Sequence, residues 1–244
     1  MKNWIGLLAS ACVATLLVAC IELDEVTQLR PDGGVELTLT VLVPELPETQ
    51  KNEKGQDVDR ELEEVFQALG SSAKLTGRGE ETKYGKQRIW FSASLPSLRS
   101  LGDIYSSLGK GSGKESKESE KKSREAIDHI FSQRSDYRVE RTKQGSLKIS
   151  REFKPGKPGS KKADKKSSKE NEELSKNMEE MMMNSMTFRF EFFSPTEVLS
   201  SNATGKYGQA LRWEASLGYL SKNPFKMEVE IASTPELEAA LLRK

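Results

Sequence analysis

The chain has 244 residues, of which 31% are charged and 7% aromatic, and Lys plus Arg (38) nearly equal Asp plus Glu (37). This balance excludes a bulk charge directed at nucleic acid or at an acidic surface, so no nucleic-acid partner is expected. With two cysteines and one histidine, a disulfide framework, a zinc finger and Cys–His catalysis are excluded as well.

The N-terminal segment has the pattern of an export signal. Residues 1–3 are a short basic start, and the uncharged run 4–19 follows without a basic cluster that would stop transfer. A basic tip, an apolar stretch and small residues at its end are typical of a secretory signal peptide. We therefore assign residues 1–19 to a signal peptide and residues 20–244 to the mature chain.

The end of that segment, Leu17, Val18, Ala19 and Cys20, resembles the lipobox of bacterial lipoproteins. In that family a diacylglyceryl group is attached to the cysteine thiol, and cleavage leaves this cysteine as the first residue. The resemblance implies cleavage between Ala19 and Cys20 and acyl chains, such as palmitate, on Cys20. Two or three chains anchor a protein stably, since each buried methylene contributes about 0.8 kcal/mol. An uncleaved membrane anchor is the alternative.

The same segment indicates a compartment. Ile21 follows Cys20 in place of Asp, and by resemblance to Gram-negative sorting this favours the outer over the inner membrane. Cys12 would be removed with the signal peptide, so an acylated mature chain would hold no free thiol. A chain without free thiols suits an oxidising compartment, and we expect a lipid-anchored protein of the bacterial cell envelope.

The first elements after the anchor read as a β-hairpin. Residues 35–43 alternate strictly between apolar and polar side chains, which predicts a half-buried strand. Turn residues at 31–34 (Pro-Asp-Gly-Gly) precede it, so residues 21–43 are predicted to form a hairpin. The same alternation recurs at residues 89–95, 137–139, 147–149, 186–192, 211–217 and 227–231, with a loop expected at 205–208.

Helices are expected to be fewer. Apolar stripes with helical spacing occur at residues 58–69, 98–108 and 126–131, and methionines at 178–186 fit a helix that leads into a strand. Strands in series with interspersed helices indicate one α+β domain over residues 20–244, with a predominantly antiparallel sheet and three or four packed helices.

Two tracts interrupt this domain. Residues 109–123 and 154–172 consist almost entirely of Gly, Pro, Ser, Lys and Glu. Such segments bury too little apolar surface to offset their ordering entropy, so disordered, charged insertions are expected there. The lysine cluster of the second tract fits either a solubilising loop or contact with anionic lipid head groups.

Motifs for catalysis and for cofactors are missing. The sequence contains no Gly-x-Ser-x-Gly, phosphate loop or dinucleotide-binding motif. His129 flanks a short apolar stripe, and the Ser-x-x-Lys spacing from Ser71 to Lys74 is expected by chance in a chain rich in both residues. The acids of residues 57–64 lack the glycine of a calcium loop, and the methionines suit packing better than copper binding. We expect no enzyme, no cofactor and no metal.

Aromatic residues are concentrated on late strands. Phe188, Phe190 and Trp213 are the candidate contacts for an apolar ligand. Phe192 and Phe193 are adjacent and must point to opposite faces of a regular strand. One face of that strand is therefore core, and the other needs a helix, a partner or an apolar ligand to cover it.

Beyond the lipobox, the layout is similar to the mycobacterial LppM-type envelope lipoproteins. The similarity lies in the cysteine that enters a strand directly, the turn at residues 31–34, and the run 202–205 that leads to Leu211, Arg212 and Trp213. It implies a compact α+β domain without catalytic residues and with a role in lipid binding. The charged insertions depart from that family, and residues 233–244 are too short and polar for the C-terminal membrane helix of such proteins.

These observations leave two functions open. The first is a non-enzymatic envelope lipoprotein, anchored through Cys20, that binds an apolar ligand such as lipid. The second is a structural or assembly lipoprotein that binds another envelope protein through a sheet edge or through its charged tracts. A pocket lined by Phe188, Phe190 and Trp213 would favour the first, and an exposed flat apolar patch would favour the second.

Overall fold

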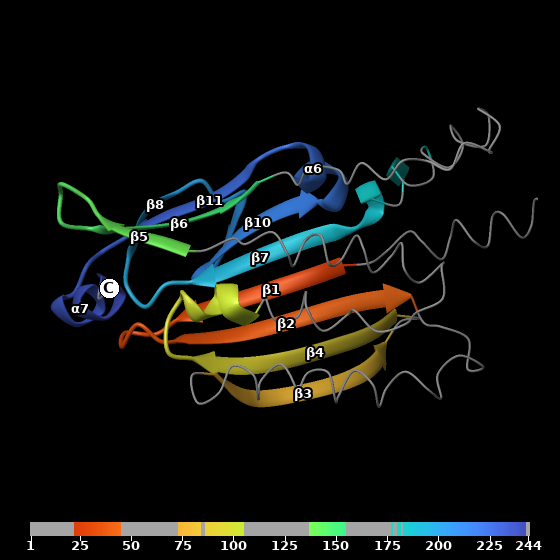
Figure 1. Ribbon diagram of the computed structural model, residues 1–244, viewed down its shortest axis with the longest axis horizontal. Helices are drawn as coiled ribbons and strands as arrows, with labels where there is room; N and C mark the ends of the chain where they lie inside the picture. Colours follow the sequence, from red (N-terminus) through yellow and green to blue (C-terminus); the bar gives the residue numbers. More distant parts are fainter. Residues whose placement is uncertain are drawn as a thin grey trace, which may run out of the picture.

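Two β-sheets make up most of the fold (Figure 1). The computed structural model describes residues 22–44, 73–83, 86–104, 137–154, 177, 180–181 and 183–242. The larger sheet has seven strands in the order β3-β4-β2-β1-β7-β10-β9, and the smaller has four in the order β5-β6-β11-β8. The strands of the larger sheet are β1 (Glu22–Leu29), β2 (Val35–Pro44), β3 (Lys74–Lys83), β4 (Lys86–Leu95), β7 (Thr187–Phe193), β9 (Gly205–Tyr207) and β10 (Ala210–Ser216). Those of the smaller are β5 (Tyr137–Arg141), β6 (Leu147–Phe153), β8 (Val198–Ser201) and β11 (Phe225–Ile231).

The predicted hairpin is confirmed as β1 and β2. Leu29 pairs with Val35, and the backbone N–H of Arg30 donates to the carbonyl of Gly34 at 2.8 Å to close the turn. Gly33 adopts a φ of 79°, which few residues other than glycine accept. Neighbouring strands are antiparallel throughout both sheets except for β1 and β7, which run parallel. The prediction of a predominantly antiparallel sheet is confirmed.

The core lies between the two sheets. Along β1 every second side chain is buried, beginning with Leu23 and ending with Leu29, and β6 and β7 show the same alternation. Phe153 of the smaller sheet stands 5.1 Å from Phe190 of the larger one, centroid to centroid. The inner face of the aromatic strand is thus the predicted core face, and the second sheet covers it. Its other face, with Arg189, Glu191 and Phe193, is partly exposed, so a helix, partner or ligand on that face stays a prediction.

Helices are few and short in the described part of the chain, so three or four packed helices are not confirmed. The two regular ones are α6 (Leu217–Lys222) and α7 (Pro235–Leu242). Of the predicted stripe 98–108, residues 100–104 are helical, with Leu98, Leu101 and Ile104 buried, and residues 183–185 form a helical turn before β7. The stripes at 58–69 and 126–131 lie outside the described residues.

Several boundaries differ from the sequence prediction. Leu217 begins α6 instead of ending a strand, because Ser216 caps that helix by accepting from the Tyr219 N–H. Residues 205–207, expected in a loop, form β9 and pair with β10. β3 and β8 were not predicted. The insertions at 109–123 and 154–172 lie outside the described residues, except for Lys154. None of the described helices is long and apolar enough to cross a membrane.

Candidate functional site

The three aromatic residues predicted to contact a ligand lie in the inter-sheet core. Phe188, Phe190 and Trp213 are 3–4% exposed. Phe190 contacts the ring of Phe225 at 6.0 Å, and the Trp213 indole N–H donates to the Asn202 side-chain carbonyl at 2.8 Å. These rings fill space between the sheets and are not among the described residues that line the cavities reported below. Their contact with a ligand stays a prediction.

A buried ion pair joins the sheets within this core. Arg151 of β6 donates from Nη1 to both carboxylate oxygens of Glu25 of β1, at 2.6 and 2.8 Å. Both side chains are 1% exposed, and the Thr27 hydroxyl also donates to Glu25, at 3.0 Å. A charge this deep is tolerated only when it is paired and hydrogen-bonded.

Three aromatic rings surround the Arg151 guanidinium. Its central carbon lies 4.6 Å from the ring centroid of Phe153, 5.1 Å from that of Tyr137 and 5.5 Å from that of Phe190. Such cation–π contacts strengthen when water is excluded. Burial also raises the pKa of the Tyr137 phenol to about 12, so this hydroxyl remains a hydrogen-bond donor over the physiological range.

Sequence reasoning missed this pair, although a signal existed. Glu25 occupies an inward position of the alternation that buries Leu23 and Leu29, and Arg151 occupies an inward position of β6. Two opposite charges at inward positions of two strands predict a buried pair. However, the sequence around each residue does not indicate that β1 and β6 face each other in the fold.

A cavity of about 530 Å³ opens beside the ion pair. It lies between the segment that follows β4, the edge strand β5 and the helix α7. Its described lining residues are Ser97, Leu98, Arg99, Tyr137, Arg138, Val139, Glu140, Ala240 and Leu241. Tyr137 therefore borders both the ion pair and the cavity. Leu98, Val139 and Leu241 offer apolar contact, while Arg99 and Arg138 are exposed cations that can pair with an anion.

The helix α7 separates this cavity from a second hollow. The second hollow measures about 540 Å³ and is bordered by Pro235, Glu238, Ala239 and Leu242 of the same helix. Leu237 and Leu241 hold α7 in the core, and Glu238 pairs with Arg141 of β5 at 2.9 Å.

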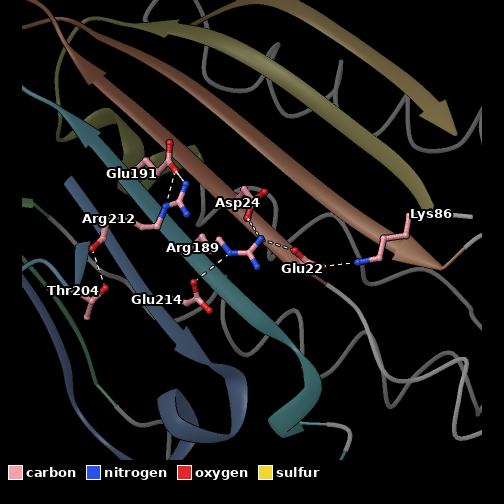
Figure 2. Close-up of polar contacts among 8 residues, drawn as sticks. All are labelled: Glu22, Asp24, Lys86, Arg189, Glu191, Thr204, Arg212 and Glu214. Atoms are coloured by element: carbon pink, nitrogen blue, oxygen red, sulfur yellow. Dashed lines mark hydrogen bonds and ion pairs between the residues drawn. The ribbon is translucent and has the colours of Figure 1, made fainter. Parts of the chain in front are cut away.

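The outer face of the larger sheet carries a network of ion pairs (Figure 2). Arg189 of β7 is its centre and bridges Glu22, Asp24 (3.5 Å) and Glu214 (3.3 Å), on strands β1 and β10. Lys86 of β4 extends the network to Glu22 at 2.6 Å. Each of these side chains retains some exposure, so each pair contributes little on its own, and together the pairs link side chains of four strands.

The pKa values of two carboxyls in the network are shifted in opposite directions. The hydrogen bond from Lys86 holds the pKa of Glu22 below its usual value. Burial raises the pKa of Asp24 despite the nearby Arg189, because desolvation disfavours its charged form. A second unit beside them joins Arg212 to Glu191, and the Tyr207 ring lies 4.3 Å from the Arg212 guanidinium.

Most of the other candidate residues from the sequence lie outside the part of the chain that the structure describes. Ala19, Cys20, Ser71, His129 and the acids of residues 57–64 lie outside the described residues, so their predicted roles stay predictions. Lys74 is exposed at the start of β3. Among the methionines, Met181 is 65% exposed and Met186 is 3% exposed, so these two do not share an environment suited to one metal.

Comparison with known proteins gives one likeness. No protein-family model matches the chain, and no curated protein matches it. Among solved structures, the NMR structure of the folded domain of LppM from Mycobacterium tuberculosis aligns with a TM-score of 0.42 and 9% sequence identity, over 90% of this chain and 94% of that one. At this TM-score and identity, the likeness does not establish membership of the LppM family.

Proposed function

We propose that this chain is a non-enzymatic lipoprotein of the bacterial cell envelope that binds an amphipathic, lipid-like ligand. The observation that carries the proposal is the cavity between β5, α7 and residues 97–99. Its volume of about 530 Å³ falls in the range of small-molecule sites. An acyl chain would lie against Leu98, Val139 and Leu241, and an anionic head group would pair with Arg99 or Arg138.

Anchoring is the second part of the proposal and rests on the lipobox pattern at Ala19 and Cys20. Cys20→Ser should release the protein from the membrane fraction and abolish incorporation of labelled palmitate. The outer membrane is the expected location, and density-gradient separation of the two membranes tests it. If the protein fractionates with the inner membrane, the expected outer-membrane location is wrong, but the anchoring through Cys20 is not contradicted.

Native mass spectrometry tests ligand binding. The soluble chain from Ile21 to Lys244, purified from envelope extract without detergent, should carry a lipid-sized adduct that is lost on denaturation. Val139→Trp fills the cavity and should remove the adduct. Lys143→Trp, an exposed position in the β5–β6 turn, is the matched control and should keep it. An adduct-free mass after incubation with envelope lipids would overturn lipid binding.

The second candidate is an assembly lipoprotein that binds another envelope protein by strand addition. Among the described strands both sheets have edge strands, and the ten-residue edge strand β3 favours this candidate. Charged side chains such as Arg78, Glu80 and Glu81 on β3 oppose it, because charge on an edge strand discourages pairing. Crosslinking in intact cells through a photoreactive residue at Glu80 separates the two candidates.

A further inference from the structure

One end of the molecule is defined by where β1 begins. Glu22 is its first residue and pairs with Thr187 of the parallel strand β7, which pairs in turn with Ser216 of β10. The starts of β1 and β7 and the end of β10 therefore lie together, at the end opposite α7 in Figure 1. Only Ile21 lies between Cys20 and Glu22 in the sequence, and two steps of chain span at most about 7 Å.

The helix α6 and residues 180–181 and 183–186 complete this end. The Leu217 N–H, at the start of α6, donates to the Met186 carbonyl at 2.9 Å, just before β7 begins. At the other end of α6, Lys222 pairs with Glu180. The two segments are thus fixed against each other and against the strand that pairs with β1. We call this surface the α6 end.

The α6 end exposes two large apolar side chains. Tyr219 is 48% exposed and Met181 is 65% exposed. Tyrosine is enriched at membrane–water interfaces, where its ring meets the acyl boundary and its hydroxyl stays hydrated. Among the described cations nearby, Lys222 pairs with Glu180 and Lys226 with Glu228, so the described part of this surface carries little unpaired positive charge.

We propose that the α6 end faces the membrane into which the acyl chains of Cys20 insert, with Tyr219 and Met181 in contact with the lipid head-group region. This orientation rests on the lipid anchoring in the proposed function. A bond path of two steps keeps the start of β1 close to the bilayer surface, and the apolar side chains of this end suit that surface. Because its lysines are paired, the contact should depend little on the fraction of anionic lipid.

The proposed orientation also determines where the cavity lies relative to the membrane. The helix α7 packs on the β1–β2 turn, where a Cβ added to Gly33 would lie 2.6 Å from the Cβ of Ala240. The eight-residue strand β1 runs from Glu22 to that turn and spans about 23 Å at 3.3 Å per step. The cavity beside α7 therefore lies near the end of β1 that is away from the anchoring membrane.

Fluorescence of the acylated, full-length mature protein in phosphatidylcholine vesicles tests the orientation. Cys12 and Cys20 are the only cysteines, so an introduced thiol is uniquely labelled once Cys12 is cleaved off and Cys20 acylated. Tyr219→Cys carries an environment-sensitive fluorophore. Tyr207→Cys, 59% exposed and on β9 away from the α6 end, is the matched control. Nitroxide-labelled lipid head groups and aqueous iodide serve as the two quenchers.

The label at Tyr219→Cys should be quenched severalfold more by the nitroxide lipids than the label at Tyr207→Cys, with the reverse order for iodide. Adding phosphatidylglycerol should leave this difference unchanged. Met181→Cys gives the same readout without removing the contact between Tyr219 and Phe225, so a local packing defect cannot imitate the result.

Each contrary result is distinguishable. If the protein floats with the vesicles and both labels respond equally, the orientation is wrong and the anchoring stands. If the chain is not acylated and does not float, the anchoring and the orientation both fall. A label at Tyr219→Cys that is shielded from both quenchers would show that a protein partner, or a second copy, covers the α6 end, and would also overturn the proposal.

Discussion

Removing one member of the buried ion pair should destabilise the fold strongly. Glu25→Gln keeps the shape of the side chain but removes the carboxylate charge that faces the Arg151 guanidinium at 1% exposure. Breaking a buried pair in this way costs about 3–5 kcal/mol. The guanidinium keeps its aromatic neighbours, the nearest at 4.6 Å, which favours the lower end of this range, about 3 kcal/mol.

Urea unfolding followed by tryptophan fluorescence measures this loss, since Trp213 lies in the same core. Glu214→Gln is the matched control, because it removes a pair with Arg189 at 3.3 Å in which both partners retain some exposure. That control should cost less than about 1 kcal/mol. The double variant Glu25→Leu with Arg151→Met replaces both charges by apolar groups and should recover most of the stability.

Two results would refute this reasoning. A loss below about 1 kcal/mol for Glu25→Gln would mean that water or a neighbouring group solvates the Arg151 charge after the change. If the double variant is as unstable as Glu25→Gln, the two side chains stabilise the fold by more than neutralising each other's buried charge. A changed m-value in either variant would point to altered compactness instead of altered pairing.

Three further predictions concern the pH dependence of stability and the conformation of the backbone at two glycines. Because folding raises the Tyr137 pKa from 10 to about 12, the unfolded chain ionises first, so stability should fall by about 2–3 kcal/mol as pH rises through this window. Tyr137→Phe should remove that part of the pH dependence. At pH 7 Asp24→Asn should stabilise the fold, since burial penalises its charge, whereas Glu22→Gln should destabilise it, and the contribution of Glu22 should fade as pH falls below 4.5. Gly33→Ala should cost more than Gly208→Ala in urea unfolding, because both have positive φ but only the first would press against α7.

Strand alternation made much of the fold predictable. Where one face of a strand is buried, the sequence must alternate with a period of two, and β2, β7 and β11 show this clearly. The parallel pairing of β1 with β7 could not be predicted in the same way. These strands are separated by more than 150 residues, and nothing in either strand identifies its partner.

The strand β3 shows why an edge escapes such prediction. Its sequence alternates glycine with charged residues, because Gly77 and Gly79 make room for the Trp90 ring of β4. A Cβ at Gly79 would lie 2.8 Å from the indole nitrogen. Glycine in a strand marks such a close approach, but the sequence does not say what approaches. The edge was therefore missed although its composition has a clear structural cause.

The candidate site, too, could be predicted from the sequence only in part. Glu25 and Arg151 could be identified as inward charges from their own strands, whereas the cavity has no local signature. Its walls come from residues 97–99, from β5 and from α7, which meet only in the folded chain. The predicted ligand contacts Phe188 and Phe190 were chosen because aromatic residues suit both a core and a pocket, and the sequence alone does not separate these environments.

The residue shared by the ion pair and the cavity limits how the cavity can change shape. Tyr137 lies 5.1 Å from the Arg151 guanidinium, and Arg151 is bound to Glu25 on the opposite sheet. Displacing Tyr137 would remove a cation–π contact with this buried guanidinium, which disfavours movement of this wall. The opposite wall is the eight-residue helix α7, which has a hollow on each side. A bound ligand would therefore lie between two walls that are both held in place, because Leu237 and Leu241 bury α7 in the core and Glu238 pairs with Arg141.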